Sequence, residues 1–78
     1  MNPDSPMPAP GTIRVRANSE WYDTPAGTNL AAFLAARGLT VGRVVVELNG
    51  EALSPGETRD ITLREGDKMQ IVRISAGG

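Results

Sequence analysis

The sequence predicts a two-layer α+β domain in which one helix packs on one face of a β-sheet. Apolar and polar residues alternate in "TIRVRA" (12–17) and again in "KMQIVRI" (68–74), the pattern of half-buried strands. Between these segments, Leu30, Phe33 and Leu34 recur at the spacing of one helix face. A single helix covers only one face of a sheet, so the pattern indicates two layers.

The size and charge of the chain limit what it can do. It has 78 residues, enough for one small domain. Its formal net charge of −1 argues against general binding to nucleic acids, which requires a basic face. No run approaches the roughly 20 apolar residues of a membrane span, and the N-terminal residues do not resemble a secretory signal. We therefore expect a cytoplasmic protein that contacts neither nucleic acid nor membrane.

Two residue types that serve many enzymes are missing, because the sequence contains no Cys and no His. Their absence excludes disulfides, thiolate nucleophiles, the common zinc sites and the usual general base near pH 7. The acidic residues are scattered, mostly through expected turns, and no glycine-rich phosphate-binding motif is present. We expect neither a metal site nor an enzyme that acts by itself.

The N-terminal part should be a β-hairpin preceded by a leader. Residues 1–11 contain four prolines and almost no core-forming residues, which predicts a disordered leader. The strand at 12–17 is followed by a turn at 18–20. The aromatic and β-branched "WYDT" (21–24) then predicts the return strand.

A short helix is expected at residues 29–37. Thr28 or Asn29 can cap its first turn, since both side chains accept hydrogen bonds from the helix N-terminus. Gly38 directly follows Arg37 and is expected to end the helix as a C′ glycine.

The second half of the domain should supply the remaining strands. The β-branched run "VVVEL" (44–48) follows a connector at 39–43 and is typical of a well-buried strand. Asn49-Gly50 marks a turn. We expect a loop at 51–60, a short strand or single turn at 61–63, and a tight turn at "REGD" (64–67) before the last strand, 68–74.

The alternation assigns the strand residues to two faces. The helix should cover the face that holds Ile13, Val15, Val44, Val46, Met69 and Ile71. The other face should expose Val45, Val72 and Ile74, with Arg14, Arg16, Gln70 and Arg73 around them. Exposed apolar patches rimmed by polar groups are common docking sites, so the expected partner-docking residues are Val45, Val72, Ile74 and Arg73.

The chain ends on two small residues and a diglycine, directly after the last expected strand. Glycine has no β-carbon, so a diglycine can enter a narrow tunnel and leaves the terminal carboxyl carbon unhindered. We expect a flexible tail whose base is held by the strand at 68–74. The tail residues are Ser75, Ala76, Gly77 and Gly78.

A combination of segments in this sequence resembles a known family. The hairpin, the single helix, "VVVELNGE", "REGDKMQIV" and the terminal "AGG" together resemble the β-grasp, ubiquitin-like sulfur carriers. The thiamine-pathway family (ThiS) is the most similar of these, ahead of the molybdopterin-pathway carriers (MoaD), because "VRISAGG" has no proline before the diglycine. The resemblance covers residues 12–78 and implies a mixed sheet of four or five strands with one main helix on one face.

The resemblance also implies a chemistry, with the chain as co-substrate. A ThiF/MoeB-type enzyme would use ATP to adenylate the Gly78 carboxylate. A sulfur donor such as a cysteine desulfurase would then convert it to a thiocarboxylate, which a ThiG-type thiazole synthase would consume. The carrier itself would bind no cofactor and supply no catalytic residue.

Three alternatives remain open at this point. The same chemistry serves molybdopterin synthesis and tRNA thiolation, and the sequence discriminates poorly between these recipients. A ubiquitin-like protein modifier also begins with adenylation of a terminal glycine. A plain β-grasp binding module would have no acyl chemistry and would not depend on Gly78.

Overall fold

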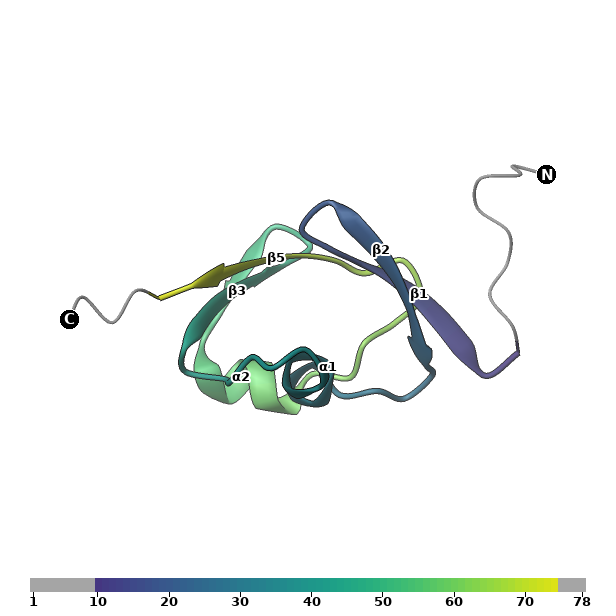
Figure 1. Ribbon diagram of the computed structural model, residues 1–78, viewed down its shortest axis with the longest axis horizontal. Coiled ribbons are helices and arrows are strands. Elements are labelled where there is room, and N and C mark those ends of the chain that lie inside the picture. Colours follow the sequence, from purple (N-terminus) through teal and green to yellow (C-terminus); the bar gives the residue numbers. More distant parts are fainter. Residues whose placement is uncertain (1–9, 75–78) are drawn as a thin grey trace.

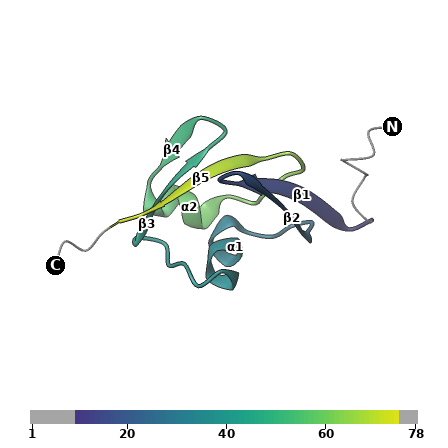
Figure 2. The same ribbon diagram turned by 45° about the horizontal axis from the view of Figure 1, so that its top comes forward.

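The computed structural model describes residues 10–74, which form five strands and two helices. Figure 1 shows the strands as one curved layer with both helices on the same side of it, and Figure 2 shows the same two layers from another direction. The described residues contain no helix long and apolar enough to cross a membrane. The elements are β1 (Thr12–Ala17), β2 (Glu20–Pro25), α1 (Leu30–Ala36), β3 (Val44–Leu48), β4 (Glu51–Leu53), α2 (Pro55–Asp60) and β5 (Lys68–Arg73).

The sheet is mixed, and its strand order is β2-β1-β5-β3-β4. Two antiparallel hairpins, β1–β2 and β3–β4, form its two sides. The last strand, β5, lies between them, parallel to β1 and antiparallel to β3. The predicted two-layer α+β architecture with a mixed sheet is confirmed, and the last strand occupies the centre of that sheet.

The core lies between α1 and the sheet. The apolar stripe on α1 is fully buried, as its spacing predicts. The Asn29 side chain caps the helix by accepting a hydrogen bond from the N–H group of Ala31 (2.7 Å). At the other end Gly38 has φ 75°, and the Gly38 and Leu39 N–H groups bond back to the carbonyls of Ala35 and Leu34. The buried apolar residues are Val15, Ala17, Leu30, Phe33, Leu34, Val44, Val46, Leu63 and Met69.

An aromatic cluster joins the first hairpin to α1. The rings of Tyr22 and Phe33 meet edge to face, with centroids 5.8 Å apart. The Arg37 guanidinium lies over both rings, 3.6 Å from the Phe33 centroid and 4.4 Å from that of Tyr22. Arg37 therefore stacks on aromatic faces in addition to donating to the Phe33 carbonyl at the helix end (3.1 Å).

The expected loop at 51–60 is wrong, because this stretch forms β4 and α2. The Asn49-Gly50 turn reverses the chain so that Glu51–Leu53 pair with the end of β3. Ser54 and Glu57 then form a capping box: the Ser54 hydroxyl accepts from the Glu57 N–H (3.1 Å), and the Glu57 carboxylate accepts from the Ser54 N–H (2.7 Å). A hydrogen bond from the Ser54 backbone, and to a smaller extent one with the Ser54 side chain, holds the pKa of Glu57 below its ordinary value.

The expected short strand at 61–63 does not join the sheet. Thr62 forms one isolated bridge with Asn29, at the start of α1. The backbone of this segment bonds to Thr28 and Leu30, and it places Leu63 in the core as expected. The residues therefore support the helix layer instead of extending the sheet.

Candidate functional site

Strand β5 carries the base of the C-terminal tail and is held on both sides. Val44–Leu48 of β3 pair with Met69–Arg73, and the Ile74 N–H continues this ladder to the Arg43 carbonyl (3.0 Å). On the other side, β1 pairs only with the first two residues of β5. The predicted tail, Ser75 to Gly78, lies outside the described residues. Its base leaves from the centre of the sheet, next to the start of β3.

Two asparagine side chains complete the hydrogen bonding of β5 where its neighbours turn away. Asn18, in the β1–β2 turn, accepts from the Ile71 N–H through Oδ1 (2.8 Å). Asn49, in the β3–β4 turn, accepts from the Lys68 N–H (2.9 Å) and donates to Asp67 Oδ1 (3.0 Å). Both residues have left-handed backbones, with φ 58° and 50°, a conformation that Asn adopts more readily than most residues. The predicted turns are confirmed, but no local pattern indicated that these asparagines support β5.

Replacing Asn49 by Ala should lower the free energy of unfolding by about 2–3 kcal/mol. Two side-chain hydrogen bonds are lost, each contributing about 1 kcal/mol, and an alanine at φ 50° adds about 1 kcal/mol of strain. Asn49→Gly loses the same bonds without the strain and should therefore fall between Ala and wild type. Urea denaturation followed by circular dichroism measures the free energy of unfolding of the three proteins. Equal stability of all three would contradict the role assigned to Asn49.

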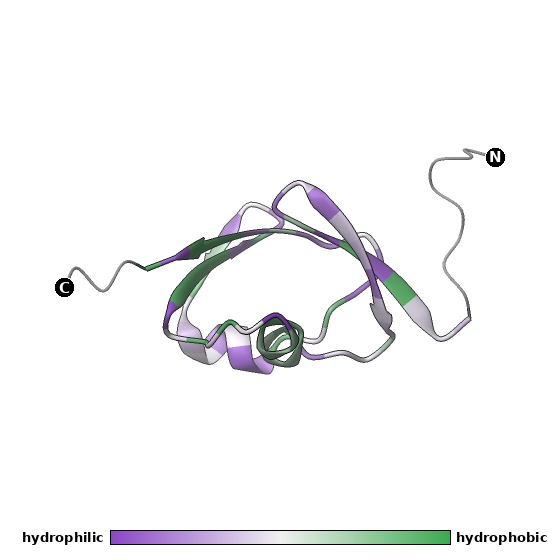
Figure 3. Cartoon of the chain, viewed as in Figure 1, coloured by the Kyte–Doolittle hydropathy of each residue, from purple (hydrophilic) through white to green (hydrophobic). Residues whose placement is uncertain are grey.

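The face of the sheet opposite the helices exposes an apolar patch beside the tail base. Val45 and Val72 are directly paired across β3 and β5 and are 46% and 61% exposed. Ile74, two residues beyond Val72, is 50% exposed. Figure 3 shows hydrophobic colour along β3 and the end of β5. We call Val45, Val72 and Ile74 the tail-base patch, which the alternation predicted.

Arg73 lies on the other side of the sheet from this patch. It is paired with Val44, whose side chain is buried towards the helices, and paired residues point to the same face. Arg73 instead lines a hollow of about 230 Å³ at the end of α1, together with Arg43 and Ile74. The expected grouping of Arg73 with the exposed face is therefore wrong, because Arg73 is an odd number of residues from Val72.

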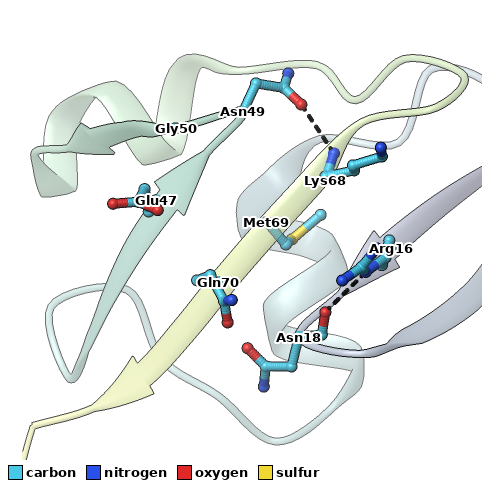
Figure 4. A pocket seen from close by; sticks show the side chains of 8 residues that line it. All are labelled: Arg16, Asn18, Glu47, Asn49, Gly50, Lys68, Met69 and Gln70. Atoms are coloured by element: carbon cyan, nitrogen blue, oxygen red, sulfur yellow. Dashed lines mark hydrogen bonds between the residues drawn. The ribbon is translucent and has the colours of Figure 1, made fainter.

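The basic residues on the open face, which is the face of the sheet opposite the helices, differ in their partners. Arg14 bonds to Asp23 through Nε (3.1 Å), which is the one ion pair among residues 10–74. Arg16 and Lys68 are directly paired across β1 and β5, and neither has a carboxylate at ion-pair distance in this part of the chain. They line a hollow of about 440 Å³ on this face, drawn in Figure 4, with Asn18, Glu47, Asn49, Gly50, Met69 and Gln70.

The "REGD" segment is a turn, as predicted. Gly66 has φ 85°, and the Asp67 carboxylate accepts a hydrogen bond from the Arg64 N–H (2.9 Å). Within the described range, no three residues of the metal-binding types gather into a possible metal site. The Asp67 carboxylate serves the turn and Asn49.

A model of the ThiS family matches residues 10–78 of the chain, which includes the whole described domain and the tail. This chain belongs to the ThiS family. A solved structure, that of a thiamine biosynthesis protein (ThiS) from Geobacter metallireducens, is similar at a TM-score of 0.65 and 27% sequence identity. The similarity covers 85% of this chain and all of that one. No curated protein matches the chain.

Membership of the ThiS family confirms the resemblance and the β-grasp fold that the sequence indicated. In this ThiS-family chain, the fold brings three of the four expected docking residues to one face, immediately before the tail. Lys68 was not singled out in the sequence, although its even spacing from Gln70 and Val72 already placed it on the same face. Its pairing with Arg16 depends on a parallel contact that no local pattern predicts.

Proposed function

We propose that this chain is a sulfur carrier of thiamine biosynthesis that holds sulfur as a thiocarboxylate on Gly78. The observation that carries the proposal is the family match, which runs from residue 10 through the terminal diglycine. The similar Geobacter metallireducens structure is that of a thiamine biosynthesis protein. The pairing of β5 with β3 also supports it, because this ladder and the bond from the Ile74 N–H to the Arg43 carbonyl hold the base of the tail at the sheet.

The proposed chemistry uses the carboxyl group of the chain and no side chain. The Gly78 carboxylate attacks the α-phosphorus of ATP on a ThiF/MoeB-type enzyme, and pyrophosphate leaves. Hydrosulfide then attacks the acyl carbon, AMP leaves, and the thiocarboxylate remains. Where a cysteine desulfurase supplies the sulfur as a persulfide, its outer sulfur attacks instead and AMP leaves. Two thiols then reduce the resulting acyl disulfide, so that the thiocarboxylate is released and the thiols are oxidised to a disulfide. Gly77 and Gly78 have no β-carbon, so this carbon is open to attack within a narrow site. A ThiG-type thiazole synthase is the proposed acceptor of the sulfur.

The tail-base patch is the proposed docking surface for the adenylating enzyme. Its three large apolar side chains are exposed at the point where the tail begins. Fully buried apolar centres provide much of the binding energy of protein interfaces, while their rims stay polar. An enzyme that covers the patch would therefore receive the tail at a defined distance and direction.

Intact-mass measurement tests the proposed function. The protein is incubated with ATP, a sulfide source and its purified adenylating enzyme. We expect the mass increase that replaces one oxygen by sulfur, and none without ATP. Absence of the shift with an enzyme proven active would reject the sulfur-carrier proposal. High-mass conjugates in a cell extract would instead indicate a protein modifier.

Replacing Val72 by Asp should raise the KM of the adenylating enzyme for this protein by at least about tenfold. The change places a charge in the middle of an apolar contact, where one desolvated charge opposes binding by more than 1.4 kcal/mol. The side chain is 61% exposed in the free protein, so the unfolding free energy should hardly change. Pyrophosphate exchange measures KM. Ala32→Asp adds the same charge on the exposed side of α1 and should leave KM unchanged, whereas equal KM values for both variants would exclude the patch from docking.

A further inference from the structure

The hollow beside the tail-base patch contains a pair of positive charges that the rest of the described chain does not neutralise. Arg16 is the second-last residue of β1 and Lys68 is the first of β5, and the two are directly paired across the parallel strands. Like charges at directly opposed positions destabilise a sheet. Arg14, two residues earlier on the same face, has its carboxylate partner in Asp23, whereas Arg16 and Lys68 have none among residues 10–74.

Neutral groups hold the guanidinium of Arg16 and the backbone of Lys68. Arg16 Nε donates to the Asn18 carbonyl at 3.1 Å, which orients the guanidinium at the edge of the hollow. The Lys68 backbone is held by the Asn49 side chain, at 2.9 Å. Figure 4 shows Lys68 extending towards the β1 side of the hollow, where Arg16 lies. The strand pairing places both side chains at this hollow, and no carboxylate among residues 10–74 lies at ion-pair distance from either, so both charges are available to an outside anion.

The remaining lining restricts what that anion can be. Glu47 also lines the hollow, but it lies on β3, across β5 from Arg16, and is paired with Gln70. Its negative charge disfavours a dianion such as free phosphate, which would approach Glu47 on the β3 side as well as the two cations. A single carboxylate on the β1 side can meet the two cations while staying away from Glu47. Charge-assisted hydrogen bonds of this kind are among the stronger polar contacts in proteins.

The hollow also lies within reach of the proposed docking surface. Lys68 and Val72 are four residues apart on the same face of β5, about 13 Å at roughly 3.3 Å per residue. A standard interface covers about 800 Å² on each partner, a patch wide enough to include both. Cations at that distance from the apolar centre would form the polar rim of the same interface.

We propose that Arg16 and Lys68 receive an Asp or Glu side chain of the adenylating enzyme when that enzyme docks on the tail-base patch. The inference rests on the proposed function and adds the chemistry by which the partner is recognised. The carboxylate would pair with both cations, relieve their mutual repulsion and set the rotational register of the carrier. Such charges mainly raise the rate and specificity of association.

Pyrophosphate exchange by the purified adenylating enzyme tests the inference with three carrier variants. Lys68→Gln and the double variant Arg16→Gln/Lys68→Gln remove the charges, and Arg59→Gln removes one positive charge from α2, on the other side of the sheet. We expect KM to rise about tenfold for the double variant, less for Lys68→Gln, and not at all for Arg59→Gln. The loss of a single charged hydrogen bond is enough to account for a change of about tenfold. Added salt should raise KM for wild type and change it little for the double variant.

The measurements separate failure of the inference from failure of the proposed function. No exchange with the wild-type carrier and an active enzyme would reject the proposed function. Normal exchange with unchanged KM for Lys68→Gln and the double variant would reject the inference alone, as would an effect confined to the later sulfur-donation step. Lys68→Gln should unfold at the same or a higher urea concentration than wild type, since it removes repulsion. A loss of stability in this variant would point to a structural role and overturn the proposal.

Discussion

Deletion of Gly78 should abolish formation of the adenylate and the thiocarboxylate. The variant still ends in a carboxylate, now on Gly77, but this group is withdrawn by about 3.5 Å, the length of one extended residue. A misplacement of about 1 Å between reacting groups can lower a rate about a hundredfold, so turnover should fall below detection. The unfolding free energy should not change, because the buried core of the described residues ends at Met69.

Intact mass and pyrophosphate exchange measure the effect, and Gly78→Ala is the matched control. Alanine keeps the length of the chain and the position of the carboxylate but adds a β-carbon beside the reacting carbon. We expect this variant to lose part of its adenylate and thiocarboxylate formation. The comparison separates the effect of a shorter tail from that of steric hindrance at the reacting carbon. A deletion variant that still gains sulfur would rule out the C-terminal carboxylate as the attachment point.

Replacing Phe33 by Ala should remove about 3–5 kcal/mol of stability, which is the usual loss for a buried phenylalanine. The side chain is 1% exposed and supports the Tyr22 ring and the Arg37 guanidinium. At the usual value per residue, a domain of this size has a total stability of about 4–12 kcal/mol, so the substitution removes a large share of it. Urea denaturation at 10 °C measures the stability that remains.

Two further variants show whether the stability lost in Phe33→Ala comes from lost burial or from lost aromatic contacts. Phe33→Leu keeps an apolar side chain in the core and loses the ring contacts, so it should lose only about 1–2 kcal/mol. Trp21→Ala removes a larger ring that is 49% exposed on the open face, and its loss should stay below about 1 kcal/mol. A loss for Trp21→Ala as large as that for Phe33→Ala would contradict the placement of the core.

Local patterns predicted the elements that depend on neighbours in the chain. The alternation at 12–17 and 68–74 and the β-branched run at 44–48 correspond to β1, β5 and β3, because side-chain period follows backbone conformation. The expected helix at 29–37 matches α1 with its caps at Asn29 and Arg37. The tail-base patch also followed from the two-residue period, since Val45 and Val72 lie an odd number of residues from buried residues of their own strands and so face the other way.

The prediction failed where local signals compete. Pro55-Gly56 is typical of a turn, yet Ser54, Pro55 and Glu57 together form the start of a capped helix. The three residues of β4 are too few to show a period, and they form a strand because the Asn49-Gly50 turn aligns them with β3. The prediction that Arg73 surrounds the exposed apolar residues is wrong, because the alternation along β5 assigns Arg73 to the face towards the helices.

Local patterns were enough to predict the two layers, the main helix and most strands, and the family resemblance pointed to the terminal diglycine. Three features depend on the folded chain: β5 lies in the centre of the sheet, Asn18 bonds to a residue 53 positions away, and Arg16 faces Lys68. The difference lies in the range of the interactions. Period, caps and turns depend on residues within one or two turns of backbone, whereas strand order depends on which pairing of the whole chain buries its apolar faces together.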